Sequence, residues 1–188
     1  EFRRVLFRST FSLSGQDKAL GGGENNASLQ LQLGRAYYDS VPSDGTQGNF
    51  TKWRLNLSRK NALSDHQALL LSYQRQWANR NLDSSEKLGI AGASAVRAYP
   101  AAEASGTEAN VLSMEWQHDV NWFKQAYKLS AFYDRGEVSK YKYDAPVNNS
   151  YALEGVGLWI GTSIPNRWGS AQWRATWSHR LGSNPVPS

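Results

Sequence analysis

The sequence predicts an all-β protein whose antiparallel strands form part of a transmembrane β-barrel. Apolar and polar residues alternate with a period of two along most of the chain, which is typical of strands with two different faces. The alternating runs are about ten residues long, the length that a tilted strand needs to cross a hydrocarbon layer. Short and long connections follow one another in turn, as in barrels that have short turns at one rim and long loops at the other.

The first half of the chain contains a short run at 10–15, read as the stub of an earlier strand, and three full runs at 28–38, 50–59 and 67–77. In each full run one face is apolar, and the other carries amides, hydroxyls or cations. The apolar rows are Leu29, Leu31, Leu33 and Tyr37; Trp53, Leu55 and Leu57; and Leu69, Leu71, Tyr73 and Trp77. Each of these runs is therefore expected to be one strand.

The second half continues with runs at 111–120, 126–136, 151–161 and 171–180. Three of these runs have a clear apolar row. These rows are Leu112, Met114, Trp116 and Val120; Tyr127, Leu129, Ala131 and Tyr133; and Trp173, Ala175 and Trp177. Both faces of 151–161 are mixed, so the orientation of that strand stays open.

The polar rows decide between a barrel and a soluble two-layer sandwich, whose strands also alternate. Charged residues stand in the middle of several runs, as Glu115 and Asp134 do, and a water-filled lumen tolerates them there. Six tryptophans are read as lying near strand ends, in an interfacial aromatic girdle: Trp53, Trp77, Trp116, Trp122, Trp168 and Trp177. The barrel is favoured, and the sandwich remains the alternative.

Composition argues against several function classes. The net charge of +5 is dispersed, with no basic face, so no nucleic-acid partner is expected. The three histidines are far apart and the chain has no cysteine, so neither a metal site nor a cofactor is expected. No nucleophile elbow or phosphate-binding loop is present in the sequence, and the protein is not expected to be an enzyme.

The first nine residues, EFRRVLFRS, differ in character from the rest of the chain. Part of this segment, RVLFRS, resembles the translation of a sequencing-adapter primer. We therefore expect residues 1–9 to be foreign and residues 10–188 to be the C-terminal part of a barrel, with one long loop at about 78–110.

That loop interrupts the alternation with a stretch rich in Gly, Ala and Ser, LDSSEKLGIAGASAVRAYPAAEASG, at 82–106. It contains the blocks LDSSEK at 82–87 and EASG at 103–106. Between them stand Val96, Arg97, Ala98, Tyr99 and Pro100. A further block downstream, FYDRG, contains Phe132, Asp134 and Gly136.

These blocks, at this spacing, resemble the outer-membrane transporters of two-partner secretion, the ShlB/FhaC/HecB haemolysin secretion/activation family. That family belongs to the same superfamily as the BamA barrel-assembly proteins. Residues 96–99 match its loop motif and residues 132–136 its F-x-D-x-G strand motif, and the resemblance extends over most of 10–188. Relatives usually carry Gly-Gly-Pro where this chain has Ala91, Gly92 and Ala93, and many have Gly in place of Ala98. Because Gly reaches dihedral angles that Ala avoids, the loop tip is where the chain should differ from the family.

The resemblance implies a monomeric sixteen-stranded barrel in the bacterial outer membrane, of which this chain holds about seven to eight strands. It implies secretion of a haemolysin-like or adhesin-like exoprotein without a nucleotide, with periplasmic POTRA domains upstream and membrane lipid around the barrel. The loop folds into the pore, and Arg97 engages carboxylates of the inner wall, for which the candidates are Asp134 and Glu115. Both carboxylates fall on the polar row of their strands, and the planar fork of Arg bonds two acceptors at once.

Two alternatives stay open. One is a BamA-like factor that inserts other barrels into the outer membrane. The other is a soluble all-β module that binds a carbohydrate or another ligand.

Overall fold

The computed structural model describes residues 3–18, 23–38, 45–101, 103–143, 149–167 and 169–182. Eight long strands follow one another along the chain, and two strands of two residues lie between the fourth and fifth of them. The long strands are β1 (Arg3–Asp17), β2 (Glu24–Tyr38), β3 (Gly48–Ser64), β4 (Gln67–Ala78), β7 (Glu108–Trp122), β8 (Gln125–Ser139), β9 (Ser150–Asn166) and β10 (Gly169–Leu181). The short ones are β5 (Leu88–Gly89) and β6 (Ser105–Gly106).

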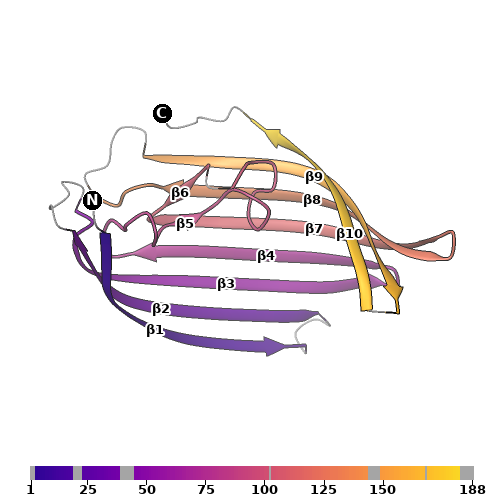
Figure 1. Cartoon of the computed structure of the whole chain (residues 1–188), viewed down its shortest axis with the longest axis horizontal. Coiled ribbons are helices and arrows are strands. Elements are labelled where there is room, and N and C mark those ends of the chain that lie inside the picture. Colours follow the sequence, from indigo (N-terminus) through magenta and orange to yellow (C-terminus); the bar gives the residue numbers. More distant parts are fainter. Residues whose placement is uncertain are drawn as a thin grey trace.

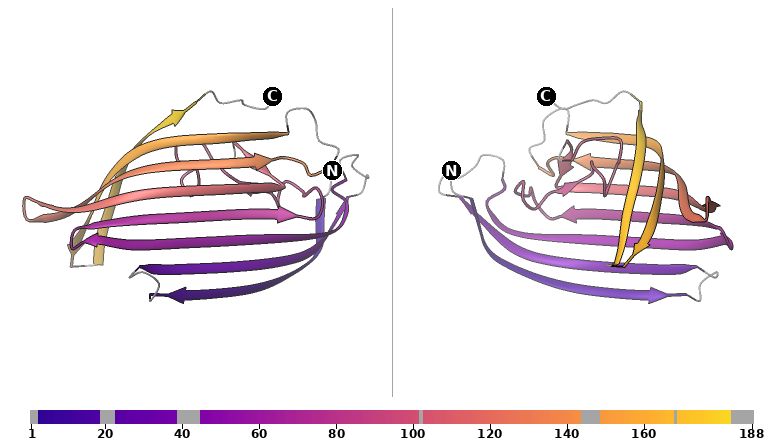
Figure 2. Two further views of the ribbon diagram at one scale, coloured as in Figure 1. Left: turned by 180° about the vertical axis from the view of Figure 1, so that it is seen from behind. Right: turned by 45° about the vertical axis from the view of Figure 1, so that its right-hand side comes forward.

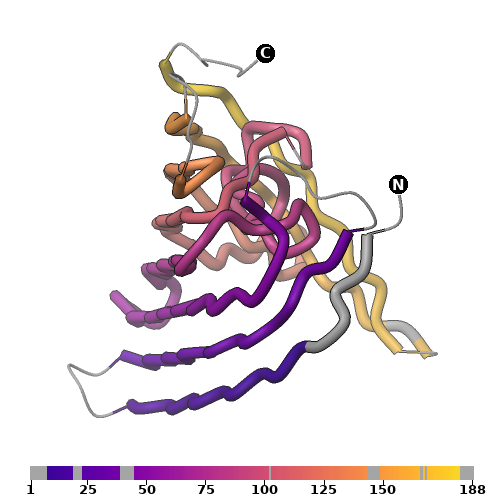
Figure 3. Tube along the Cα trace, turned by 90° about the vertical axis from the view of Figure 1, so that its left-hand side faces the viewer, coloured from indigo at the N-terminus to yellow at the C-terminus, as the bar shows by residue number. Residues whose placement is uncertain are grey.

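The long strands form one antiparallel sheet in the order β1-β2-β3-β4-β7-β8-β9-β10, so each strand pairs with its neighbours along the chain (Figure 1). The sheet curves like a segment of a barrel wall, and the segment between β4 and β7 lies in its concavity (Figures 2 and 3). This confirms the prediction of an all-β antiparallel barrel fragment. Among the described residues, no helix has the length and apolarity that a membrane crossing requires.

Strand register places the polar rows on the concave face. Gly34, Lys52, Gln76 and Asp134 are buried on that face, whereas the apolar rows point outward. Several outward side chains are well exposed, such as Trp177 at 62%. In the described part of the chain no second sheet covers this outer face, which argues against the sandwich.

The register also settles the orientation of β9, which the sequence left open. Asp134 pairs with Gly155 and Ser130 pairs with Trp159, so Gly155 and Trp159 face the concavity together with Gly157. The outward row of β9 is Val156, Leu158 and Ile160. Both faces read as mixed in the sequence because small glycines occupy the inward row, where other strands have polar side chains.

The strands are longer than expected, with 12 to 17 residues in place of about ten. The prediction of tryptophans near strand ends is confirmed for Trp77 and Trp122, at the ends of β4 and β7, and is wrong for Trp53 and Trp116, which lie well inside β3 and β7. The reason is that sheet pairing continues beyond the apolar rows. Trp168, which is also assigned to the girdle, is outside the described residues.

Residues Arg3 to Ser9, for which we expect a foreign origin, pair with β2 as the first part of β1, and the register shifts between Val5 and Phe7. Backbone pairing is available to almost any sequence beside an open edge, so this pairing does not decide the origin. The assignment of 1–9 as foreign stays a prediction.

Candidate functional site

The candidate site is the segment between β4 and β7, residues 79–107, which we call the β4–β7 loop. It crosses the concave face over β7, β8 and β9 and carries the hairpin of β5 and β6, in which Leu88 pairs with Gly106 (Figures 1 and 3). This segment corresponds to the loop expected at about 78–110.

An apolar cluster fixes the middle of the loop to the wall. Ile90 and Val96 are fully buried and pack with Val111 of β7, Val138 of β8 and Leu153 of β9. Burial of an aliphatic side chain contributes about 1.5 to 3 kcal/mol. The loop is therefore a packed layer on the wall, and its backbone is ordered by this contact.

Arg97 extends from this layer to two acidic side chains of the wall. Its Nε and Nη2 atoms donate to the two carboxylate oxygens of Asp134, each over 2.8 Å. Its Nη1 donates to Glu115 over 2.5 Å, and Nη2 also donates to the Ser113 hydroxyl over 3.1 Å. The bidentate contact with Asp134 uses the planar fork of the guanidinium, a geometry that the ammonium group of Lys does not have.

The surroundings of this ionic cluster are nearly dry. Asp134 is fully buried, and Arg97 is 14% exposed. The guanidinium lies over the ring of Phe132, 3.5 Å from its centroid, and Trp159 donates its indole N–H to Glu115 over 3.1 Å. Burial lowers the pKa of Arg97, but the hydrogen bonds and charges of Asp134 and Glu115 outweigh burial and raise it above the ordinary value. Arg97 therefore stays charged.

The backbone of the arginine block is held as well. The amide of Arg97 donates to Asp134 over 3.1 Å, and its carbonyl accepts from the Ser178 hydroxyl of β10 over 3.2 Å. The carbonyl of Ala98 accepts from Arg180 over 3.3 Å. Four consecutive wall strands, β7 to β10, thus contact this one block.

The remaining residues of the block have different surroundings. Val96 and Tyr99 are buried, and the guanidinium of Arg180 lies 4.7 Å from the centroid of the Tyr99 ring. Pro100 is exposed, and Ala98 is half-buried. The structure therefore brings Val96, Arg97, Ala98 and Tyr99 against the wall, whereas Pro100 faces solvent.

Glycines of the wall make room for the loop. A Cβ added at Gly136 would stand 3.0 Å from both Ile90 and Val96, and one added at Gly155 would stand 2.6 Å from the Cβ of Ala98. Gly136 is the last position of the F-x-D-x-G block, so the structure gives a packing reason for glycine there. No sequence pattern indicated the same need at Gly155.

The loop tip keeps glycine where its backbone requires one. At 91–93, where relatives usually carry Gly-Gly-Pro, this chain keeps the middle glycine, and Gly92 has a φ of +102°, a value that L side chains rarely adopt. Ala91 and Ala93 lie outside the left-handed region. Ala91 and Ala93, which stand where relatives have Gly and Pro, therefore do not require a left-handed backbone.

A second ionic contact lies at the base of the loop. Glu86 is 2% exposed and pairs with Lys52 of β3, which is 4% exposed, over 2.8 Å. Lys52 and Gln76 of β4 both donate to the carbonyl of Glu86, over 2.9 and 3.1 Å. Arg8, in the segment for which we expect a foreign origin, also contacts Glu86. We call the Glu86–Lys52 pair the base anchor and the contacts of Arg97 the tip anchor.

From the sequence, Glu86 is expected to be solvated or to serve the fold of the loop. It is not solvated, because it is buried against the wall, where it holds the base of the loop. No motif singles out Lys52 as a site residue. The alternation of the sequence offers one indication. Lys52 stands next to Trp53, which points outward, so the Lys52 side chain must point inward, and this places a cation inside the barrel near the loop. Neighbouring contacts reinforce the base, since Tyr38 donates to Asp83 over 2.6 Å.

Among the described residues there is no group of three or more side chains that could hold a metal ion. The site is a set of charge-assisted hydrogen bonds between a loop and a wall. Its chemistry is that of a noncovalent attachment through charged donors and acceptors.

Comparison with known proteins gives consistent results. A family model described as haemolysin secretion/activation protein ShlB/FhaC/HecB matches residues 6–162. The heme/hemopexin transporter protein HuxB of Haemophilus influenzae is 29% identical over 140 residues, which make up 72% of this chain and 25% of that protein. The outer membrane transporter CdiB of Dickeya dadantii is 29% identical over 143 residues, 72% of this chain and 24% of that protein.

A solved structure has the same fold. CdiB from Escherichia coli superposes with a TM-score of 0.69 at 21% identity, over 92% of this chain and 36% of that one. The chain spans about a quarter of the length of the curated relatives that it matches.

Proposed function

The chain belongs to the haemolysin secretion/activation family ShlB/FhaC/HecB, and from this premise we propose that it is part of a transporter that secretes an exoprotein in two-partner secretion. It is a protein of the bacterial outer membrane. The curated relatives are named as transporters. We further propose that the partner is a haemolysin-like or adhesin-like exoprotein, and that the barrel acts as a monomer surrounded by lipid.

The observation that carries the proposal is a charged loop attached to the inner wall by bonds that can be broken. The tip anchor consists of Arg97 with Asp134 and Glu115, and it holds the loop on the concave face of the sheet. Charge-assisted hydrogen bonds contribute about 1.5 to 3 kcal/mol each, which holds a loop but allows it to move. In this proposal the attached loop narrows the lumen, and its displacement opens the path.

Deletion of the gene tests the secretion function. We expect one exoprotein to disappear from the culture medium, while the other outer-membrane barrels stay at their normal abundance. A general loss of barrels from the outer membrane would instead support the BamA-like assembly factor. A medium that is unchanged by the deletion would contradict secretion.

The role of the loop is tested in the full-length transporter. Arg97→Ala should reduce secretion while the barrel still inserts, as judged by its abundance and heat-modifiable mobility in outer membranes. The exchange Arg97→Asp with Asp134→Arg should restore part of the secretion, because it returns opposite charges to the pair. If the Arg97→Ala variant secretes the exoprotein at the unchanged level, the proposed role of the loop in secretion is contradicted, whereas the family assignment still stands.

A further inference from the structure

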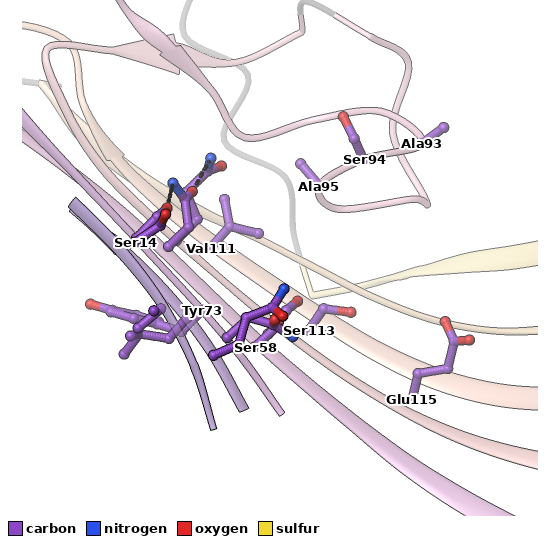
Figure 4. A pocket seen from close by; sticks show the side chains of 18 of the residues that line it. Ser14, Ser58, Tyr73, Ala93, Ser94, Ala95, Val111, Ser113 and Glu115 are labelled. Carbon is purple, nitrogen blue, oxygen red and sulfur yellow. Dashed lines mark hydrogen bonds between the residues drawn. The ribbon is translucent and has the colours of Figure 1, made fainter. Parts of the chain in front are cut away.

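The β4–β7 loop is held differently at its tip and at its two ends. The tip borders a cavity of about 790 Å³, and in Figure 4 the tip residues Ala93, Ser94 and Ala95 lie across an open space from the strands. At the two ends of the loop, by contrast, Asn81 and Thr107 are fully buried. The tip therefore has room to move away from the wall, whereas the ends are packed.

Asn81 bonds to the connection between β8 and β9 in the way that a neighbouring strand would. Its side-chain oxygen accepts from the backbone amides of Lys142 and Tyr143, over 2.6 and 2.9 Å. Its side-chain nitrogen donates to the carbonyl of Tyr143 over 3.0 Å. A carboxamide both donates and accepts, so Asn makes a set of bonds that neither an ionised Asp nor Ala reproduces. The three bonds attach the beginning of the loop to the backbone of this connection.

Thr107 attaches the other end of the loop to the same connection. Its hydroxyl donates to the carbonyl of Lys140 over 3.0 Å and accepts from the backbone amide of Leu82 over 3.2 Å. The Thr107 amide also donates to the Lys140 carbonyl, over 3.4 Å. The two ends of the loop are thus bonded to each other and to one connection. We call these bonds of Asn81, Leu82 and Thr107 the rim clasp, since β4 and β8 end at the same rim of the sheet (Figure 1).

Contacts with the other side of the sheet complete the attachment. Arg80 donates through Nε to the carbonyl of Gly45 over 3.2 Å and through Nη1 to the carbonyl of Asn49 over 3.1 Å. The base anchor then attaches Glu86 to Lys52 of β3. The beginning of the loop therefore bridges β3 and the β8–β9 connection, which β4 and β7 separate in the sheet.

Fixed ends favour the docking of the tip. A loop with free ends samples many conformations when it is detached, and it loses this freedom when it returns to the wall. Fixing the ends restricts the detached loop beforehand, so less entropy is lost on docking. The attachment also raises the effective concentration of Arg97 at Asp134. The rim clasp can thus support the tip anchor without touching it.

We infer that Asn81 is a positioning residue of the loop: through the rim clasp it keeps both ends of the loop fixed while the tip detaches and returns as a hinged unit. This inference rests on the proposed role of the loop in secretion and adds to it the residue that holds the loop in place. The part that moves would then lie between the base anchor and Thr107.

Cysteine labelling at two alanines tests the clasp in the full-length transporter in detergent, with any other cysteines replaced by serine. The rate of maleimide labelling at Ala95→Cys reports on the tip. The rate at Ala78→Cys reports on the beginning of the loop, because Ala78 is buried in a cluster with Phe50 and Leu82. Position 78 becomes accessible when the beginning of the loop lifts away from the wall.

The test variant is Asn81→Ala, and Asn149→Ala is its matched control. The Asn149 side chain forms two bonds of the same kind inside the β8–β9 connection, with the backbone amide and carbonyl of Tyr141 over 2.8 and 2.7 Å. Thr107→Val keeps the shape of the side chain and loses the hydroxyl, and it carries the test if Asn81→Ala does not insert into the membrane.

Asn81→Ala removes three buried hydrogen bonds, so we expect labelling to rise roughly tenfold at both alanines, a change in equilibrium constant of about 1.4 kcal/mol. Thr107→Val should act in the same direction, and Asn149→Ala should leave both rates within about twofold of the parent. Arg97→Ala should raise labelling at position 95 alone, because it frees the tip while the clasp holds the ends.

Unchanged rates in both Asn81→Ala and Thr107→Val would overturn the clasp. Equal rises in Asn81→Ala and Asn149→Ala would also overturn it, since they would show a general loosening of the connection. A rise at position 78 in Arg97→Ala as large as that at position 95 would overturn the fixed ends. Labelling needs no secretion, so a gene deletion that leaves the medium unchanged contradicts the secretion function separately.

Discussion

The strength of the tip anchor gives a quantitative expectation for Arg97→Ala. The substitution removes four side-chain hydrogen bonds, to Asp134, Glu115 and Ser113. It leaves the Asp134 carboxylate fully buried without its cation, and removal of one partner of a buried ion pair costs about 3 to 5 kcal/mol. Glu115 keeps its bonds from Gln117 and Trp159, so we expect a value near the lower end, about 3 kcal/mol.

This loss should appear as easier detachment of the loop. Since each 1.4 kcal/mol is a factor of ten in an equilibrium constant, about 3 kcal/mol raises the detached population roughly 100-fold. These 188 residues contain no cysteine, so Ala95→Cys, in a full-length transporter whose other cysteines, where present, are replaced by serine, reports on the tip, where Ala95 is 7% exposed. In the full-length transporter in detergent, the rate of maleimide labelling at position 95 should rise by up to this factor in Arg97→Ala. Arg97→Lys should give an intermediate rate, because a single ammonium group replaces the fork.

The matched control is Phe123→Cys, at a side chain that is 97% exposed in the turn between β7 and β8. Its labelling rate should be the same whether or not Arg97→Ala is present, since that turn does not contact the loop block. A labelling rate at position 95 that stays within about twofold of the parent would refute the tip anchor as the group that holds the loop. The apolar cluster of Ile90 and Val96 would then hold it alone.

Three other predictions concern the packing of the loop. Lys52→Met should destabilise the barrel by at most about 3 kcal/mol because it removes one of the two cations paired with the buried Glu86 and leaves Arg8, and adding Glu86→Gln should recover part of the loss, as measured by thermal unfolding in detergent. Gly155→Val should displace the arginine block and raise labelling at the tip, whereas Gly15→Val, where a Cβ meets nothing within 4 Å, should not. Gly92→Ala should cost about 1 to 3 kcal/mol of loop stability through its φ of +102°, measured by the protection of the tip from proteolysis; an unchanged cleavage rate would contradict the strain.

The alternation of the sequence predicted the fold because a period of two allows only two choices of face for each strand. Because a barrel of this kind has a water-filled lumen, the polar row of each strand must point into it, as it does at Asp134 and Glu115. The orientation of β9 could not be read in this way. Its inward row is shaped by contact with the loop and with Phe132, and glycines chosen for close approach carry no polarity signal.

The base anchor escaped prediction for a different reason. Arg97 was recognised through a motif whose spacing sets it apart from solvated arginines, whereas Glu86 and Lys52 lie 34 positions apart and each looks ordinary alone. Their pairing depends on where the loop leaves β4 and on the path that it takes back over β3. Such contacts arise from the three-dimensional course of the loop and have no counterpart in a local pattern.

The two anchors differ in burial, and this difference sets the order in which they should release. Glu86 and Lys52 are 2% and 4% exposed, and Lys52 and Gln76 both bond the backbone of the loop at that point. Arg97 and Glu115 are 14% and 13% exposed and line a cavity of about 790 Å³, so water reaches them first. A charge-assisted bond weakens as its surroundings become wet, because the effective dielectric constant rises. The tip anchor should therefore loosen while the base anchor still holds, so that the loop swings about Glu86.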